Sequence, residues 1–191
     1  MQTKIRCEWS SKDDLYIKYH DQEWGVPIYD DSSLFEFLIL ETFQAGLSWL
    51  TILRKRENFR AAFDNFDYKK IAQYDENKYN ELMQNEGIIR NKLKIKAAIS
   101  NAQAFMKVQA EFNSFSNYFW AFSGGKTITN QFETLKELPA KTELSDKISK
   151  DMKKRGFKFV GSTVIYAHMQ ATGMVNDHLV SCFRHKEVAN K

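Results

Sequence analysis

The two cysteines of this chain stand near its opposite ends, and each lies close to a histidine in the sequence. Cys7 is thirteen positions before His20, and His178 is four positions before Cys182. Thiolate and imidazole are the ligands that zinc prefers, and four of them complete a tetrahedral structural site. If these four residues meet, one ion fastens the start of the fold to its end. A C-terminal segment too short to bury much surface then stays docked.

Two other arrangements of the sulfur atoms are open at this point. Cys7 and Cys182 can form a disulfide, although nothing N-terminal resembles a secretory signal and cytosolic thiols stay reduced. They can also be two unrelated buried side chains. His185 is close enough to Cys182 in the sequence to compete as a ligand. His168 falls within a predicted helix, and we interpret it as an ordinary core residue.

The length and composition predict one globular domain. A chain of 191 residues can bury a real core, and 43% hydrophobic with 14% aromatic residues argues against disorder. No apolar run approaches the length of a membrane-spanning helix. We therefore expect a single domain over residues 1–191 that is soluble, cytoplasmic and without a membrane partner. The net charge of +4 is too small to indicate nucleic-acid binding unless the charges cluster.

Almost every segment has the pattern of a helix, because only two prolines and eight glycines interrupt the chain. Ser33 and Glu36 form a predicted capping box for a helix that ends before Gly46. Residues 126–130 resemble a strand, but the segment is too isolated to form a sheet. The predicted fold class is therefore all-α. Helices are expected over residues 13–20, 33–45, 48–63, 67–74, 75–84, 91–110, 115–122, 145–154 and 162–172.

A turn with the sequence KKRGFKFVGST, residues 153–163, joins the last two of these helices. Its two glycines allow a tight turn and a close approach of the backbone to a ligand, and the next helix begins with unpaired N–H groups. A helix–hairpin–helix unit grips a DNA phosphate in this way, through the main chain. An ordinary helical corner with a solvated basic end is the alternative. The predicted DNA-binding residues are Gly156, Phe157, Lys158, Val160, Gly161, Ser162 and Thr163.

Two further basic runs, at residues 54–56 and 90–96, are weaker indications of DNA binding. Charged runs on helices usually face water.

A glutamate falls on the most apolar flank of the helix predicted over residues 33–45. A projection at 3.6 residues per turn places Glu41 among Leu34, Phe37 and Leu38. A buried carboxylate must be protonated, paired or held for a ligand, because leaving it unpaired costs roughly several kcal/mol. An ion pair with an arginine is one reading. A pocket for a flat, hydrogen-bonding ring is the other, since Gln44, Gly46 and Trp49 follow.

Together these residues resemble a known family, the 3-methyladenine DNA glycosylases of the bacterial constitutive type. The likeness runs from near the first residue to Cys182, so it covers essentially the whole chain. The combination of the hairpin sequence with the downstream VNDH, residues 175–178, is highly specific. The other matching stretches are CEW (7–9), LYIKYHDQEWGVP (15–27), ETFQAGLSWLTILRKRENFRAAF (41–63) and GIIRNKLKI (87–95).

The resemblance implies a fold, a metal and a pocket. The family has the helix–hairpin–helix glycosylase fold, in which two helical lobes surround a DNA-binding groove. Its zinc ligands correspond to Cys7, His20, His178 and Cys182 here, which implies one structural Zn²⁺ joining the N- and C-terminal segments. Its base-binding residues correspond to Trp9, Tyr19, Glu41 and Trp49. Glu41 is then the catalytic residue, which accepts hydrogen bonds from the adenine edge and acts by electrostatics.

One departure from the wider superfamily bears on the chemistry. Most helix–hairpin–helix glycosylases carry an aspartate downstream of the hairpin, where this chain has Asn176; we expect the neighbouring Asp177 to point elsewhere, although an alignment slip of one residue reverses that assignment. Bifunctional members carry a lysine just past the hairpin, where this chain has Ser162 and Thr163. Without an amine nucleophile there is no Schiff base, so we predict a monofunctional enzyme.

The expected substrate is 3-methyladenine in alkylated double-stranded DNA, and the products are the free base and an abasic site. A monomer suits this reaction. Three alternatives are a glycosylase with a broader alkylpurine range, a non-catalytic DNA-binding module stapled by zinc, and a small-molecule enzyme that uses Glu41 as a general base. The basic hairpin argues against the last.

Overall fold

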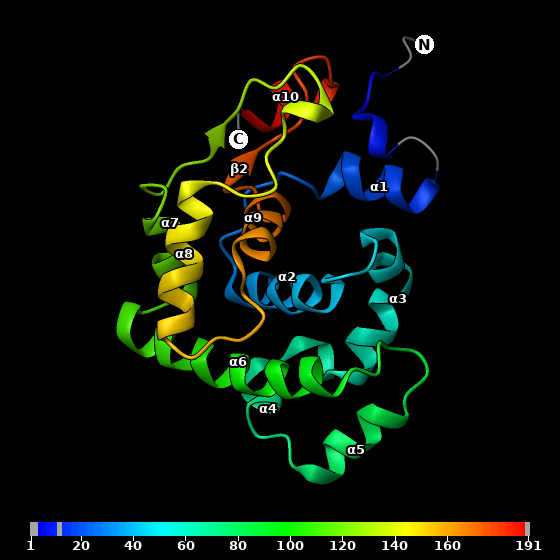
Figure 1. The fold of residues 1–191 in the computed structure, drawn as a ribbon, viewed down its shortest axis with the longest axis vertical. Helices are drawn as coiled ribbons and strands as arrows, with labels where there is room; N and C mark the ends of the chain where they lie inside the picture. The colour runs from blue at the N-terminus through cyan, green and yellow to red at the C-terminus, as the bar shows by residue number, and fades with distance from the viewer. Residues whose placement is uncertain (1–3, 11–12, 190–191) are drawn as a thin grey trace.

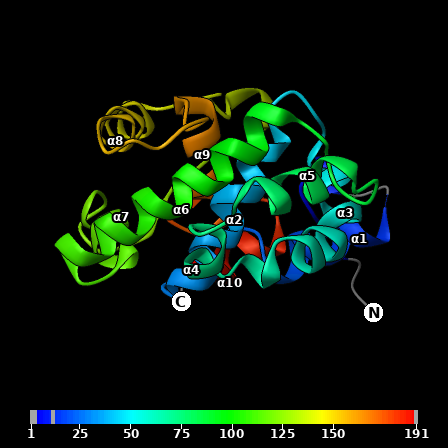
Figure 2. The same cartoon turned by 90° about the horizontal axis from the view of Figure 1, so that it is seen from below.

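The structure is a computed structural model that describes residues 4–10 and 13–189. These ranges hold ten α-helices and one short pair of strands, so the predicted all-α class is confirmed in the coarser sense of a mostly helical fold. Figures 1 and 2 show how the helices are arranged. The helices are α1 (Asp14–Gln22), α2 (Asp31–Gln44), α3 (Trp49–Ala62), α4 (Tyr68–Ile71), α5 (Glu76–Gln84), α6 (Lys92–Phe112), α7 (Phe115–Ala121), α8 (Glu143–Lys154), α9 (Ser162–Ala171) and α10 (Phe183–Ala189). Three 3₁₀ turns complete them: η1 (Glu8–Ser10), η2 (Asp64–Phe66) and η3 (Leu135–Glu137). No helix in the described part of the chain combines the length and the apolar character needed to cross a bilayer.

Two predicted helix starts are wrong. The side chain of Asp30, not Ser33, caps α2 by accepting a 2.8 Å hydrogen bond from the Ser33 amide, so the helix starts earlier. Glu36 is held away by an arginine on the neighbouring helix, which the sequence cannot place. Helix α8 begins two residues before the predicted Ser145, because Thr142 and Ser145 form a reciprocal capping box.

The segment judged too isolated for a sheet does pair, which corrects that prediction. Strand β1 (Ile128–Thr129) lies parallel to β2 (Val175–Asn176), with Ile128 opposite Val175. The Ile128 amide donates to the carbonyl of Met174 over 2.9 Å. The partner strand is more than forty positions away in the chain, so only the tertiary fold reveals it.

Helix α2 is the central helix of the main core. It packs against α3, α6, α7 and α9, and side chains such as Phe35, Leu38 and Phe43 are fully buried. Nine of its residues are buried, including Glu41, so both flanks face other helices. The helix therefore carries its one buried carboxylate into the interior.

A second, smaller core forms where the ends of the chain meet. It contains Cys7, Tyr19, Trp24, Leu179 and Cys182. Figure 1 shows α1 and α10 near the same end of the molecule, which agrees with this cluster.

Gly173 allows its own backbone to pack directly against the backbone of Val26 and Pro27. Its φ is +74°, and a Cβ there would lie 2.4 Å from the backbone of Val26 and Pro27. Only glycine fits this crossing.

Candidate active site and metal centre

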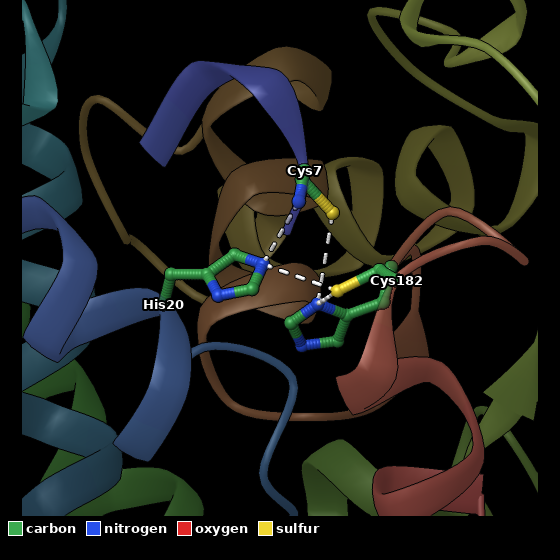
Figure 3. A group of neighbouring side chains, drawn as sticks. Cys7, His20 and Cys182 are labelled. Atoms are coloured by element: carbon green, nitrogen blue, oxygen red, sulfur yellow. Dashed lines mark hydrogen bonds between the residues drawn. The ribbon is translucent and has the colours of Figure 1, made fainter. Parts of the chain in front are cut away.

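The four predicted metal ligands meet at one point in the fold. The ligand atoms of Cys7, His20, His178 and Cys182 all lie within 4.8 Å of one another, and all four side chains are buried. Cys182 Sγ lies 3.4 Å from His20 Nε2 and 3.6 Å from His178 Nδ1, and Figure 3 shows Cys7, His20 and Cys182 converging. In a tetrahedral zinc site, sulfur and nitrogen ligands are about 3.6 Å apart. The donor set and its spacing fit Zn²⁺.

The outer nitrogen of each imidazole has a partner of its own. His20 Nδ1 lies 2.9 Å from a carboxylate oxygen of Asp21, which Arg6 also binds. His178 Nε2 lies 3.0 Å from the carbonyl oxygen of Trp24. Both contacts leave the inward-facing nitrogen without a proton, as metal-binding histidines require. A hydrogen bond from Cys7, followed by those from His178 and His20, lowers the pKa of Cys182.

The other two histidines lie outside this cluster. His185 Nε2 is 2.8 Å from the carbonyl oxygen of Asn130, so this nitrogen is engaged outside the cluster. His168 is buried beside Phe119, and neither of its ring nitrogens has a hydrogen-bond partner within the described ranges. Burial lowers the pKa of His168 to about 3, so this residue stays neutral.

A cavity of about 260 Å³ lies between α1, the end of α2, the start of α3 and α9. It is small for a ligand pocket and suits a single flat ring system. Five aromatic side chains, one carboxylate, two amides and two aliphatic side chains form its wall. They are Trp9, Tyr16, Tyr19, Trp24, Trp49, Glu41, Gln44, Gln170, Leu138 and Ala167.

Glu41 lies in this cavity as a carboxyl group without a partner. Its side chain is 4% exposed, and no hydrogen bond or ion pair reaches it from any residue that the structure describes. The arginine expected in the alternative reading is engaged elsewhere, because Arg56 binds Glu23 and Glu36. Burial raises the pKa of Glu41 to about 8. The group is therefore mostly protonated at neutral pH in the empty pocket.

The other three predicted base-binding residues also line the cavity. Tyr19 is buried and lines the cavity with Glu41, and desolvation followed by the charge of Glu41 raises its pKa. Trp49 lies 5.5 Å from Tyr19 between ring centroids, and its Nε1 is buried without an acceptor in the described ranges. An unused donor and an unused carboxyl group in one pocket leave polar atoms for a ligand.

The pocket and the metal cluster share a wall. Trp9 lies 5.3 Å from the His20 ring and 5.0 Å from Trp24, while Trp24 lies 4.6 Å from His178. These two tryptophans also line the cavity. Fixing the four ligands therefore fixes two aromatic walls of the pocket.

The predicted hairpin lies between α8 and α9. The Phe157 and Val160 side chains are buried and anchor it, while Gly156 makes the turn at φ +95°. The side-chain amide of Asn101, on α6, binds both the amide and the carbonyl of Lys158, over 2.7 and 3.0 Å. The turn is thereby held rigidly against α6.

The first turn of α9 is open to an anion. Gly161 occupies the N-cap position, so no side chain there accepts from the first N–H groups of the helix. Thr163 is exposed beside them, and the Ser162 hydroxyl bonds the exposed carboxylate of Asp146. The backbone can bind a phosphate, while Ser162 already has a protein partner.

The Asn176–Asp177 pair faces the interior. The Asn176 side chain donates to the carbonyl of His185 over 2.9 Å. Asp177 accepts from Asn130 at 2.6 Å, Tyr166 at 2.5 Å and Gln170 at 2.8 Å. Neither residue lines the cavity, and the Asp177 carboxylate reaches the pocket only through Gln170.

The remaining basic runs are mostly engaged within the protein. Arg54 pairs with Asp13, and Lys55 donates to the carbonyls of Glu86 and Gly87. Lys94 departs from the expectation of solvated charge, because it is buried. Its Nζ donates to the carbonyls of Phe43 and Ala45, over 2.8 and 2.7 Å, and so caps the C-terminal end of α2.

Comparisons with known proteins agree with this geometry. The family model described as methyladenine glycosylase matches residues 9–185. This chain belongs to the methyladenine glycosylase family. It is 50% identical to DNA-3-methyladenine glycosylase 1 of Escherichia coli K12 over 177 residues, which are 93% of this chain and 95% of that protein. The resemblance predicted from the sequence is confirmed.

Solved structures of methyladenine glycosylases have the same fold. A crystal structure of 3-methyladenine DNA glycosylase I superposes with a TM-score of 0.91 at 50% identity, covering 94% of this chain and 98% of that one. A structure of the Staphylococcus aureus enzyme, solved for its recognition of 3-methyladenine, gives 0.90 at 36% identity, covering 93% and 95%. Enzymes of this family cleave N-glycosyl bonds.

Sequence reasoning missed four residues of the cavity, which are Tyr16, Leu138, Ala167 and Gln170. Tyr16 stands three positions before Tyr19, a spacing that puts both on one face of α1, so this residue was within reach of a pattern argument. Gln170 and Leu138 come from α9 and from the loop before α8. Nothing in their local sequence indicates the pocket, because only tertiary packing brings them there.

Proposed function

We propose that this protein removes 3-methyladenine from alkylated double-stranded DNA, by hydrolysis of the N-glycosidic bond and without strand cleavage. The proposal rests on the carboxyl group of Glu41, which has no partner among the residues that the structure describes and lies in an aromatic cavity of about 260 Å³. A buried polar group without a partner is rare and needs a ligand or another explanation.

The charge of the damaged base explains how this pocket selects it. A 3-methyladenine nucleotide carries a positive charge on its base, whereas adenine is neutral. The cation lowers the pKa of Glu41, which then ionises and accepts hydrogen bonds from the base edge. Electron-rich rings such as Trp9 and Tyr19 stack favourably on the same cation. Neutral adenine neither favours the ionised form of Glu41 nor stacks as a cation on the aromatic rings. The free energy needed to flip it out of the duplex is therefore not offset in the pocket.

The same charge explains why little catalytic machinery is needed. When the bond between the base and C1′ breaks, its electron pair moves to the cationic base, which leaves as a neutral molecule. The sugar becomes an oxocarbenium ion, and a water molecule adds at C1′ and loses a proton. The products are free 3-methyladenine and an abasic site. Glu41 is the catalytic residue in this scheme, acting through its charge.

Residues around the pocket supply the grip on DNA. The open amides of α9 and the hairpin residues Gly156, Phe157, Lys158, Val160, Gly161, Ser162 and Thr163 bind a backbone phosphate, mainly through the main chain. Positions 162 and 163 hold serine and threonine in place of a lysine that could form a Schiff base, so the enzyme is monofunctional in this proposal. In this proposal Leu47 fills the gap left by the flipped base, because it is 41% exposed in the loop between the lining residues Gln44 and Trp49.

The Cys7, His20, His178 and Cys182 cluster binds one structural Zn²⁺ in this proposal. The supporting observations are the ligand spacing, the complete burial and the partners of both outer imidazole nitrogens. With four protein ligands the site would leave no coordination position open to substrate, so a bound ion would stabilise the fold and the pocket wall.

The protein works as one domain over residues 1–191, as a monomer in the cytoplasm. One copy supplies the pocket, the hairpin and the proposed zinc ligands. Size-exclusion chromatography with light scattering tests the monomer: a stable dimer at the concentration of the activity assay contradicts it.

One experiment separates this proposal from its alternatives. The protein is incubated with methylated duplex DNA, and the released bases are identified by chromatography and mass spectrometry. We expect 3-methyladenine alone, with abasic sites but no broken strands. Release of 7-methylguanine or hypoxanthine indicates a broader glycosylase. DNA binding without release of any base indicates a non-catalytic module.

A further inference from the structure

A second hollow lies beside the hairpin, outside the base pocket. Its volume is about 500 Å³, and it lies between α6 and the tip of the hairpin. Figure 2, which views the molecule from below, shows α6 running past the connection between α8 and α9. The lining residues are Leu93, Lys96, Ala97 and Ser100 of α6 with Lys158 and Phe159 of the hairpin.

We propose that this groove extends the DNA-binding surface and receives the sugar–phosphate backbone of the duplex next to the phosphate held by the hairpin. The inference rests on the proposed function and deepens it, because it assigns contacts beyond the hairpin amides. Phe159 is the new residue at its centre.

The backbone at Phe159 shows that the ring is kept at a conformational cost. Its φ is +54°, in the left-handed region that glycine adopts freely and phenylalanine resists. The Phe159 ring is 39% exposed, so its burial in the core does not offset this conformational cost. Phe157 and Val160 are the buried side chains that anchor the turn. Strained residues that persist in this way gather at functional sites. A glycine would satisfy the turn, so the aromatic side chain has a task outside the core.

The opposite wall is also apolar and exposed. Leu93 is 68% exposed, more than any other large hydrophobic residue in the described ranges. Together with Phe159 it forms an apolar surface that suits the faces of deoxyribose rings.

The charged side chains that line the groove itself are both positive. Lys96 Nζ also lies 5.1 Å from the centroid of the Tyr79 ring, beside a neighbouring hollow that Asp75 and Glu76 line. Lys96 and Lys158 are the only charged residues that line the groove, and Lys92 stands one turn earlier on α6, exposed to solvent. Neither Lys96 nor Lys158 forms an ion pair with an acid among the residues that the structure describes. An occupant with negative charges and apolar faces fits this lining, as a nucleic acid backbone does.

DNA is favoured over an acidic peptide because of continuity along the chain. Phe159 directly precedes Val160, Gly161 and the open amides of α9, so a strand held at those amides passes the groove. The Lys158 amide donates to Asn101 Oδ1 and Asn101 Nδ2 donates to the Lys158 carbonyl, so the hairpin is fixed against α6, which forms the other wall of the groove. A preformed surface of this kind needs no ordering when DNA binds.

The test compares two substitutions, Phe159→Gly and Lys96→Gln, with Lys107→Gln as the control on the same helix. Lys107 is exposed and does not line the groove. The affinity for a duplex with one abasic-site analogue is measured by fluorescence anisotropy over a salt series, along with thermal unfolding. We expect Phe159→Gly to bind DNA on the order of three- to tenfold more weakly, yet to unfold at the same or a higher temperature. Lys96→Gln should lower the slope of log K against log salt by about 1. Lys107→Gln should leave both quantities unchanged.

If both groove variants keep the parental DNA affinity and the parental slope of log K against log salt, the inference is wrong. An acidic peptide is then the better candidate for the groove. A Phe159→Gly variant that is less stable and binds DNA normally overturns it as well, because the ring is then structural. Failure of the proposed function is distinguishable, since the parent protein is assayed in parallel for base release from methylated DNA. If the parent protein releases no base, the proposed glycosylase function is wrong. If the parent is active and the variants bind DNA as it does, only the proposal for the groove is wrong.

Discussion

Two buried carboxyl groups of this protein have opposite surroundings. Asp177, at the end of β2, is 1% exposed and accepts hydrogen bonds from three side chains. Glu41, on α2, is 4% exposed and has no partner in the described part of the chain. One is satisfied by the fold itself, and the other is left for something the fold does not contain.

The contrast separates a buried carboxylate whose hydrogen bonds the fold supplies from a buried carboxyl group for which the described residues supply none. A satisfied buried network fixes the packing around it, whereas an unsatisfied acid loses its hydration with no return. The metal cluster and Lys94 belong with Asp177, because their polar atoms all have partners. Substitution of each group shows whether it stabilises the fold, as a group with partners should, or not.

The largest effect is expected from Cys182→Ala. The variant should lose one equivalent of zinc per chain and on the order of 4 kcal/mol or more of stability, because metal binding here is coupled to folding. Elemental analysis and urea unfolding measure the two quantities, with the exposed neighbour Ser181→Ala as control. A variant that keeps its zinc points to another ligand, such as His185, or to a different site.

Asp177→Ala should have the next largest effect. It leaves the donors of Asn130, Tyr166 and Gln170 without their acceptor, which costs about 3 kcal/mol of unfolding free energy. Asp177→Asn keeps an acceptor oxygen and should lose less. Base release is compared at a temperature where both variants are folded. If Asp177→Ala keeps its stability and loses only its activity, the aspartate acts in the reaction and our division is wrong.

Lys94→Met tests a satisfied cation near the pocket. The methionine fills similar space but leaves the carbonyls of Phe43 and Ala45 uncapped, so we expect a loss of about 2 kcal/mol. The loop after α2, which carries Leu47, loses its anchor, and base release from DNA should fall with it. Lys107→Met is the matched control, because Lys107 is exposed on the same helix and lies outside the proposed DNA-binding groove. Equal behaviour of the two variants contradicts a positioning role for Lys94.

The smallest effect is a pH dependence of stability that comes from Glu41. Burial raises the pKa of this group from an ordinary 4.5 to about 8, so the folded state holds a proton that the unfolded state has released. The resulting contribution to stability is complete below about pH 4.5 and is lost as the pH rises through 8. Between pH 5 and pH 8.5, Glu41→Gln should therefore gain on the order of 2 kcal/mol relative to the parent, allowing for water in the open pocket. The unfolding free energies of both proteins are measured by urea unfolding over this pH range. If they change with pH by the same amount, the expectation is wrong.

The cluster of Cys7, His20, His178 and Cys182 and the acid in the pocket were predictable from the sequence because their signals are local. Cysteine and histidine at ligand spacing restrict the chemistry to very few options, and a helix projection is enough to put Glu41 on an apolar face. The relation between these sites was not predictable. Trp9 and Trp24 join them only through tertiary contacts.

The features that sequence reasoning missed all depend on distant partners. The pairing of β1 with β2 needs segments more than forty positions apart. Lys94 stands in a basic run and has the pattern of a solvated charge, yet two carbonyls from another helix surround it. Phe159 was left out of the predicted DNA-binding residues because only the backbone angle and the exposure of its ring distinguish it from the buried Phe157.

The most direct test of the account is the binding of free 3-methyladenine to the parent protein and to Glu41→Gln, measured by tryptophan fluorescence with urea unfolding alongside. We predict at least a roughly tenfold loss of affinity and a comparable loss of base release in the variant, while its unfolding free energy at pH 7 stays the same or rises. A variant that binds the base as tightly as the parent, and releases it from DNA at the parental rate, contradicts the assignment of Glu41.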